Sequence, residues 1–206
     1  VTLAASRHLL PYGGDAGGKL LALPKGIVTF VGIIACIAFL VEGAIMDWGG
    51  VFLTTVRHFD MALAGTGFTV FSAAMLTMRL LGDWTVQKLG QERVVIGGSL
   101  LAVAGFLFII FAPTAVLLYL GFFFIGVGCA NVVPVFFSLL GKQHVMPISL
   151  AVPAVSTLGY LGILMGPAAI GFIAHQTSLY AAFTLLAALV LLQAVIAAYV
   201  YRNIVE

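Results

Sequence analysis

Charged side chains are scarce in this sequence of 206 residues. Lys, Arg, Asp and Glu together make up 8% of the chain, whereas hydrophobic residues make up 63%. A soluble domain carries about 25% charged residues, because its surface must stay wet. The composition therefore excludes a water-soluble fold and indicates an integral membrane protein. The formal charge of +2 is also too small to suggest a nucleic-acid partner.

Several patterns that carry chemistry are missing. Cys36 and Cys129 lie in separate apolar runs without a CxxC or Cys/His cluster, so we expect reduced cysteines that only pack. His58, His144 and His175 lack metal-ligand spacing, and the phosphate-binding pattern GxxxxGK[ST] does not occur. We therefore predict no metal site, no cofactor and no ATP-driven pump.

An intramembrane serine protease is one enzyme class that the length allows. Such an enzyme would need a Gly-x-Ser motif in one span and a His in another. Gly97-Gly98-Ser99 stands in an apolar stretch, and no His lies within a predicted span. We therefore do not expect an enzyme, and the protease remains the less favoured alternative.

Long apolar runs predict an all-α membrane protein with six transmembrane helices. A spanning helix needs about 20 apolar residues, and a barrel would show short alternating segments instead. The transmembrane domain, residues 26–201, has predicted spans at Ile27–Met46, Gly65–Gly82, Val94–Ala112, Thr114–Leu140, Ile148–Ala174 and Ser178–Tyr201. Residues 1–25, rich in Gly and Pro and beginning with Val1, are predicted as a linker that opens a fragment of a longer protein.

The positive charges predict the orientation of the spans. One side of the predicted bundle holds eight of the nine Lys and Arg residues: Arg7, Lys19, Lys25, Arg79, Lys88, Arg93, Lys142 and Arg202. The other side holds only Arg57. Because cytoplasmic loops are enriched in Lys and Arg, the linker and the tail, residues 202–206, are both predicted to be cytoplasmic.

Polar residues are unevenly distributed among the spans. The third and sixth look apolar all round, with Ser99 in the third and Thr184 and Gln193 inside the sixth, so we expect these two to face lipid. The other four carry polar groups on single helical faces. Such groups turn toward other helices or a water-filled cavity, which favours a shared polar cavity. Alternatively, they only tie helices together through hydrogen bonds.

Glu42 is the most informative polar residue. It lies 15 residues past Ile27, or about 22 Å along the helix at about 1.5 Å per residue, which predicts a place in the outer third of the membrane. An acid there is a candidate proton carrier or substrate partner. It could instead pair with Arg57 or cap the outer end of the bundle. Arg79 could snorkel to the inner surface or pair with Asp83, four residues later.

Four segments carry recognisable motifs: RLLGDWTVQKLGQER (79–93), GILMGPAAIG (162–171), EGAIMDW (42–48) and GVGCANVVP (126–134). Together they resemble the major facilitator superfamily, and specifically the C-terminal half of a twelve-helix transporter. The loop at 79–93 resembles the family's signature cytoplasmic loop, with Lys88 and Gly90 at matching positions and Asp83 and Gln87 as departures. GILMGPAAIG (162–171) is similar to the fifth helix of each half. EGAIMDW (42–48) and GVGCANVVP (126–134) are similar to a bacterial inner-membrane branch. The fourth span lacks the arginine usual in an N-terminal half.

The resemblance implies an arrangement and a mechanism. Helices one and four of a half would line a central path, two and five would flank it, and three and six would face lipid. Two halves would rock around a site near the midplane. The predicted cytoplasmic latch consists of Arg79, Asp83, Lys88, Gly90 and Arg93. The predicted close-packing residues are Gly162, Gly166, Pro167 and Gly171.

We therefore predict secondary active transport of a small solute across the bacterial inner membrane, coupled to protons. Glu42 is the predicted coupling or substrate-binding group, and Asn131, Ser156 and Tyr160 are the predicted cavity contacts. The partners would be the solute, protons, the lipid bilayer, and either a missing N-terminal six-helix half or a second copy. The competing hypothesis is a membrane assembly or sensor protein that keeps the fold without transporting.

Overall fold

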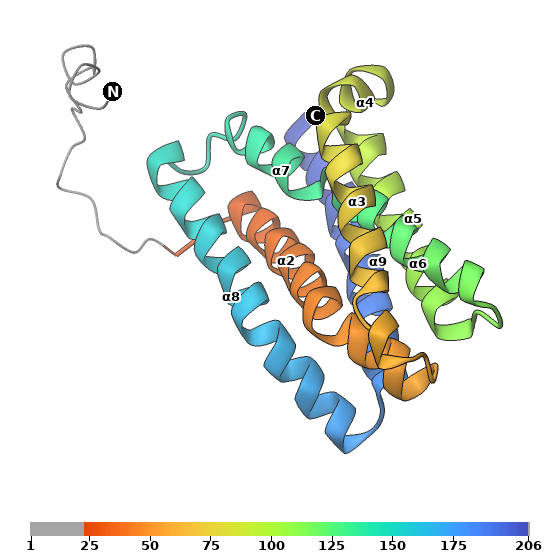
Figure 1. The fold of residues 1–206 in the computed structure, drawn as a ribbon. Helices are drawn as coiled ribbons and strands as arrows, with labels where there is room; N and C mark the ends of the chain where they lie inside the picture. Colours follow the sequence, from red (N-terminus) through yellow and green to blue (C-terminus); the bar gives the residue numbers. More distant parts are fainter. Residues whose placement is uncertain (1–22, 206) are drawn as a thin grey trace, which may run out of the picture.

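The computed structural model describes residues 23–205. Most of the predicted linker and Glu206 lie outside this range. Within it, every regular element is a helix (Figure 1). The longer helices are α2 Ile27–Val51, α3 Thr66–Leu80, α5 Gln91–Phe111, α6 Ala115–Cys129, α8 Ile148–Gln176 and α9 Leu179–Val205. The shorter ones are a π-helix Phe52–Val56, a 3-10 helix Met61–Leu63, α4 Gly82–Leu89 and α7 Val132–Leu140.

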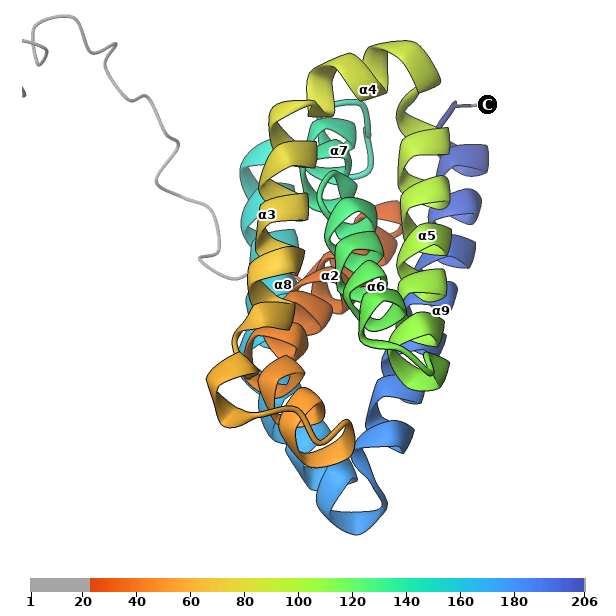
Figure 2. The ribbon, with the colours of Figure 1, turned by 45° about the vertical axis from the view of Figure 1, so that its right-hand side comes forward.

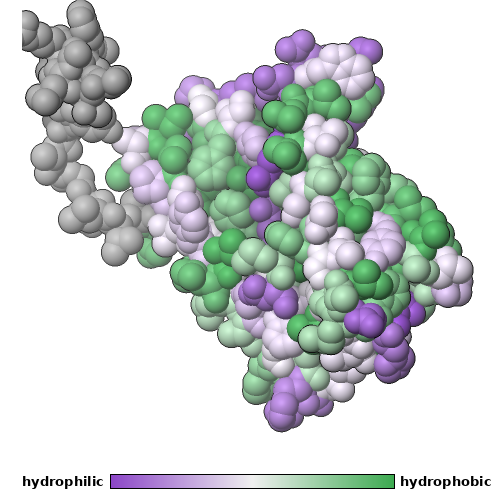
Figure 3. All heavy atoms as spheres, viewed as in Figure 1, coloured by the Kyte–Doolittle hydropathy of each residue, from purple (hydrophilic) through white to green (hydrophobic). Residues whose placement is uncertain are grey.

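Six helical segments are long and apolar enough to cross a membrane, which confirms the predicted all-α membrane fold. They are Ile27–Val56, Met61–Leu80, Gln91–Phe111, Ala115–Leu140, Ile148–Gln176 and Leu179–Asn203. The last five agree with the predicted spans to within four residues at each end. Hydrophilic residues gather mainly at the two ends of the bundle and in a few patches between them, on the face that Figure 3 shows.

The first helix does not end at Met46 as predicted. α2 runs on to Val51, and the π-helix Phe52–Val56 continues it. Hydropathy falls at Asp47 and Trp48, but neither residue interrupts a helical backbone. The prediction was wrong because a drop in hydropathy is not a helix stop.

The longer helix changes the positions of two residues. The indole Nε1 of Trp48 donates to the carbonyl of Pro167 on α8 at 3.0 Å, so Trp48 is held against a neighbouring helix. Glu42 lies 15 residues after Ile27 and 14 before Val56. It therefore stands at the middle of the first spanning helix and not toward its outer end.

The helices form two groups, which meet where α2 packs against α9. α2 lies beside α8, while α5 packs against both α6 and α9, and α3 lies against α6 (Figures 1 and 2). α4, α7 and the C-terminal end of α9 lie at one end of the bundle, which we call the α4 end. The π-helix and the turn between α8 and α9 lie at the opposite end.

Glycines permit the closest helix contacts. A Cβ on Gly105 of α5 would lie 2.6 Å from the carbonyl oxygen of Gly121 on α6, and a Cβ on Gly162 of α8 would collide with the carbonyl oxygen of Cys36 on α2. Real Cβ atoms essentially never approach so closely. Side chains larger than hydrogen would therefore separate these helix pairs.

α3 and α8 are the least covered helices. In their most apolar stretches 22% and 28% of residues are buried, whereas the other four spanning helices bury between 44% and 56%. α2 runs between these two poorly covered helices (Figure 1). The face formed by α3, α2 and α8 is thus the part of the described bundle with most surface left for a further partner, whether protein or lipid.

Of the three polar residues noted in the two helices predicted to face lipid, Ser99 and Gln193 lie inside, whereas Thr184 is exposed on α9 and donates to the Tyr180 carbonyl of its own helix at 2.8 Å. Ser99 of α5 is fully buried and Gln193 of α9 is 1% exposed. The Gln193 Nε2 donates to the Ser99 Oγ at 3.0 Å. The buried pair of Ser99 and Gln193 thus serves the contact between α5 and α9.

Candidate functional site

The fourth spanning helix is broken in its middle. α6 ends at Cys129 and α7 begins at Val132, with Ala130 and Asn131 between them. In a continuous helix the carbonyl of Ala130 would accept from the backbone nitrogen of residue 134. That residue is Pro134, which has no N–H to donate. The break therefore leaves the Ala130 carbonyl open to a donor from elsewhere.

Arg79 supplies that donor and joins three spanning helices. From the last turn of α3, its Nε donates to the Ala130 carbonyl at 3.3 Å. Its Nη2 donates to the Oε1 of Glu42 on α2 at 3.0 Å. One guanidinium thus bridges the middle of the first spanning helix, the end of α3 and the break between α6 and α7.

Asn131 reinforces the same junction. Its Nδ2 donates to the carbonyl of Met78, the residue before Arg79, at 3.3 Å. Gly82 opens α4, and a Cβ there would lie 2.6 Å from the Asn131 Oδ1. A glycine at this position therefore lets the junction between α3 and α4 meet the break in the fourth spanning helix.

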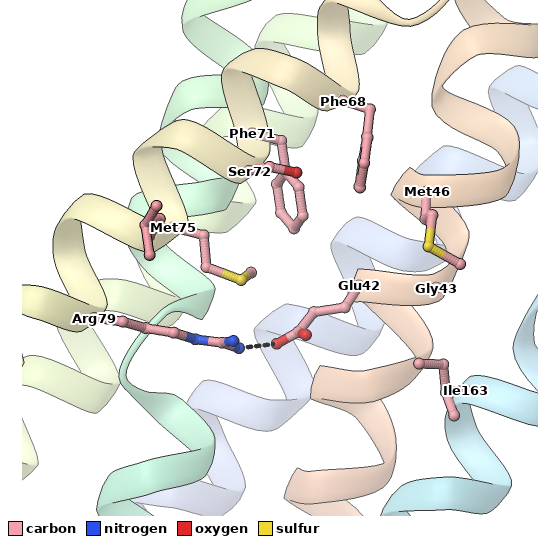
Figure 4. Close-up of a pocket in the computed structure, with 10 residues that line it drawn as sticks. Glu42, Gly43, Met46, Phe68, Phe71, Ser72, Met75, Arg79 and Ile163 are labelled. Carbon is pink, nitrogen blue, oxygen red and sulfur yellow. Dashed lines mark hydrogen bonds and ion pairs between the residues drawn. The ribbon is translucent and has the colours of Figure 1, made fainter.

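A pocket of 290 Å³ lies on one side of the ion pair, between α2 and α3. Figure 4 shows Glu42 and Arg79 pointing toward each other across it, with Phe68, Phe71 and Ser72 farther along α3. Its lining residues are Glu42, Gly43, Met46, Phe68, Phe71, Ser72, Met75, Leu76, Arg79 and Ile163. Apart from the ion pair, Ser72 is the one polar side chain in this lining. We call this the Glu42 pocket.

A second pocket of 250 Å³ lies on the other side of Arg79, toward the α4 end. Its lining residues are Arg79, Gly82, Asp83, Val86, Gln91, Asn131, Pro134, Val135 and Ser138. We call this the Asp83 pocket. Arg79 contributes to both linings. Its side chain is 43% exposed, whereas that of Glu42 is 17% exposed.

The structure excludes two ion pairs that the sequence left open as alternatives. Glu42 does not pair with Arg57, and Arg79 does not pair with Asp83; they pair with each other. Arg57 instead uses its Nη2 to donate to the carbonyls of Ile109 and Ile110, at 2.6 and 2.7 Å. Among residues 23–205, Glu42 and Arg79 form the one ion pair within 4.0 Å.

Ser156 and Tyr160 do not join the other predicted site residues. Neither lines the Glu42 pocket or the Asp83 pocket. Tyr160 is 62% exposed on α8, and its ring stacks on Phe39 of α2 with centroids 6.0 Å apart. Ser156 is half-buried one turn earlier on α8. A role for these two in solute binding stays a prediction.

The remaining latch residues lie around α4. The Lys88 Nζ stands 4.4 Å from the centroid of the Trp84 ring. Gly90 links α4 to α5 with φ at +84°, a backbone region that favours glycine. Asp83 and Arg93 are exposed in the first turns of α4 and α5. Their predicted action as a latch is not tested by these positions.

The predicted packing residues all meet α2. A Cβ on Gly166 would lie 2.9 Å from the Leu40 Cγ, and a Cβ on Gly171 would lie 2.7 Å from the Trp48 indole. Pro167 accepts the Trp48 hydrogen bond, and Gly162 faces the Cys36 carbonyl. This segment of α8 therefore forms the close contact with α2.

Sequence reasoning missed the apolar walls of the Glu42 pocket. Met46, Phe68, Phe71 and Met75 carry no chemical signal that separates them from lipid-facing residues. The pairing of Glu42 with Arg79 did have a signal, because ionisable residues in membrane spans usually pair with one another. These were the only two charged residues placed within predicted spans.

The fold and the ion pair together define a polytopic helical membrane domain with a charged junction in its interior. The chain belongs to the Major Facilitator Superfamily, whose family model matches residues 28–205. It is 45% identical over 190 residues to an uncharacterized MFS-type transporter of Yersinia pestis, covering 92% of this chain and 50% of the relative. It is 34% identical over 183 residues to an uncharacterized transporter of Sinorhizobium fredii, covering 89% and 48%.

A solved structure shows the same fold. The POT family transporter PepTSo superposes with a TM-score of 0.70 at 22% identity, covering 89% of this chain and 38% of that one. The chain spans about half the length of the curated relatives it matches. The relatives are transporters, in agreement with the predicted family and with a transport function.

Proposed function

We propose that this chain is one six-helix half of a secondary active transporter that moves a small solute together with protons by alternating access. The family and its transporter relatives support transport. The lengths of the relatives support a second six-helix half, which would cover the exposed face of α3, α2 and α8. The observation that carries the proton-coupling proposal is the Glu42–Arg79 pair at 3.0 Å between two pockets.

A carboxylate in the middle of a spanning helix can change charge, whereas a guanidinium cannot lose its proton in a protein. Protonation of Glu42 would weaken its contact with Arg79 and free α2 from the junction of α3 and α6. Arg79 lines both the Glu42 pocket and the Asp83 pocket. We propose that making and breaking the Glu42–Arg79 contact accompanies the opening of the path to one side or the other.

The orientation follows from the positive charges. Lys88, Arg93, Lys142 and Arg202 belong to the loops and helix ends of the α4 end. Because Lys and Arg mark cytoplasmic loops, we propose that the α4 end faces the cytoplasm of a bacterial inner membrane, with both termini on that side.

The test uses the full-length protein in liposomes that enclose a pH-sensitive dye. Small solutes added outside would include a sugar, phenylacetate, phenylacetamide and 2-phenylethylammonium. We expect one of them to drive proton entry in the parent protein, and Glu42→Gln to abolish it. Asp47→Asn is the matched control, because Asp47 is an exposed acid on the same helix that lines neither pocket.

The alternatives predict different results. A non-transporting assembly or sensor protein would give no solute-driven proton entry and no solute uptake, and that result would overturn the proposal. A protease would need an accessible Ser99, but this hydroxyl is fully buried and accepts a hydrogen bond from Gln193. We therefore propose no proteolytic function.

A further inference from the structure

The hydrogen bonds of Arg79 show which partner is free to leave. Its Nε contact is fixed by the backbone, because Pro134 leaves the Ala130 carbonyl without a helical donor. If Arg79 turned away, that buried carbonyl would lose its partner, which is costly in an apolar interior. The contact with Glu42 joins two side chains, and protonation can remove its charge. Arg79 is therefore the fixed member of the pair and Glu42 the exchangeable one.

The charge balance of the Glu42 pocket then selects the sign of a ligand. With Glu42 ionised, the pair is neutral. When Glu42 takes up a proton, the guanidinium keeps its charge and loses its counter-ion. Leaving this half-exposed charge without a counter-ion between the apolar walls of the pocket is unfavourable. The protonated site therefore favours an anion at the Arg79 Nη2.

Other charged or titratable groups around the pair do not offer an equal substitute. Asp83 of α4 lines the pocket on the other side of Arg79. Asp47 of α2 is exposed, five residues beyond Glu42. Cys129 of α6 is buried beside the pair, and α8 contributes only Ile163 to the lining. Asp83 is thus the internal competitor for Arg79, and the Glu42 pocket itself contains no second carboxylate.

The walls of the pocket describe the rest of the ligand. Met46, Phe68, Phe71 and Met75 form apolar and aromatic walls, with Ser72 as a single hydroxyl. A carboxylate matches the planar fork of a guanidinium, which binds it through two parallel hydrogen bonds. The volume of 290 Å³ lies just below the usual range for ligand pockets, about 300–1,000 Å³, and so favours a small ligand. A small carboxylate with an apolar or aromatic body fits these features.

We infer that the transported solute is a small monocarboxylate with an apolar body, which replaces Glu42 on Arg79 when Glu42 takes up a proton. This inference rests on the proposed transport function. The exchange balances: one proton moves to the Glu42 carboxylate, one anion binds the guanidinium, and the net charge of the site is unchanged. Proton and solute would consequently cross together in equal numbers without net charge.

The test measures binding to the full-length protein in lipid nanodiscs. The probes share one aromatic ring and differ in charge: phenylacetate, phenylacetamide and 2-phenylethylammonium. We expect phenylacetate to bind best, and its affinity to rise about tenfold or more between about pH 8 and about pH 6, a typical size for coupling between two ligands. Glu42→Gln should bind phenylacetate tightly at both pH values, Arg79→Gln should not bind it, and Asp47→Asn should behave as the parent protein.

Two results would overturn the inference. One is preferential binding of 2-phenylethylammonium that Glu42→Gln abolishes, which would assign a cationic solute. The other is equal affinity of the parent protein for all three probes. This measurement uses the parent protein alone and does not depend on whether a variant folds. Transport is judged separately: a sugar that drives proton entry while phenylacetate fails to bind would keep the proposed function and remove this inference. If phenylacetate binds as expected but none of the tested solutes crosses, the proton-linked anion site would stand, and the proposed transport function would be overturned.

Discussion

Arg79 donates to the carbonyl that Pro134 leaves without a helical partner. The Arg79 Nε lies 3.3 Å from the oxygen of Ala130, four residues before the proline. Pro134 of the fourth spanning helix thus leaves a free carbonyl, and this carbonyl holds the Arg79 guanidinium of the second spanning helix in place. Glu42 of the first spanning helix then completes the junction.

Replacing Pro134 by alanine should loosen this junction. An N–H at position 134 can donate to the Ala130 carbonyl, so α6 and α7 would join and Arg79 would lose its fixed acceptor. We expect solute-driven proton entry to fall about tenfold, equivalent to about 1.4 kcal/mol, while the melting temperature is unchanged or higher. Loss of activity with a lowered melting temperature would indicate a general packing role instead.

Substitution of Gly82 by alanine should destabilise the protein. The added Cβ would lie 2.6 Å from the Asn131 Oδ1, so the amide must move and its bond to the Met78 carbonyl is disturbed. We expect a loss of about 1–3 kcal/mol in the free energy of unfolding, measured in detergent. Gly97→Ala is the control, because a Cβ there meets nothing within 4 Å. A neutral Gly82→Ala would contradict the close contact.

Arg57 should stabilise the end of the bundle opposite α4 without affecting solute binding. Its Nη2 donates to the carbonyls of Ile109 and Ile110 at the end of α5, and its guanidinium carbon stands 5.8 Å from the ring centroids of Phe52 and Tyr180. Arg57→Gln should reduce stability by about 1.5–3 kcal/mol and leave phenylacetate affinity unchanged. A change in affinity at unchanged stability would show that Arg57 belongs to the solute path.

The buried pair of Ser99 and Gln193 should show a non-additive effect. The Gln193 Oε1 is buried with no hydrogen-bond partner in the described structure, so Ser99→Ala would also leave the Nε2 unpaired. We expect that single variant to lose about 1–3 kcal/mol, and Ser99→Ala with Gln193→Leu to recover most of it. Thermal unfolding of Ser99→Ala, Gln193→Leu and the double variant measures this difference. Additive losses would contradict an isolated polar pair.

The architecture was predictable because membrane spans leave a direct signal in the sequence. Apolar runs located five of six helices to within four residues at each end. The end of the first helix was missed because Asp47 and Trp48 resemble a membrane boundary, although Trp48 bonds to the backbone of α8. Hydropathy reports where a segment is polar, and it does not report where a helix stops.

The site was predictable only in part. Glu42 and Asn131 stood out as polar residues in apolar helices, and both reach the Arg79 junction. The partner of Glu42 was missed because it depends on the lateral packing of α2 against α3, which spacing along one helix does not encode. Tyr160 shares a helical face with Ser156, but the rotation of α8 about its axis decides where that face points.

Infrared difference spectroscopy on binding of phenylacetate tests the exchange at Glu42 most directly. The ligand would carry a carbon-13 carboxylate, so that its own bands are shifted from those of the protein. We expect binding near neutral pH to produce the carbonyl band of a protonated carboxylic acid in the parent protein and in Asp47→Asn, and not in Glu42→Gln. Binding of phenylacetate without that band would show that Glu42 stays ionised on Arg79, and would contradict proton-linked exchange at this site.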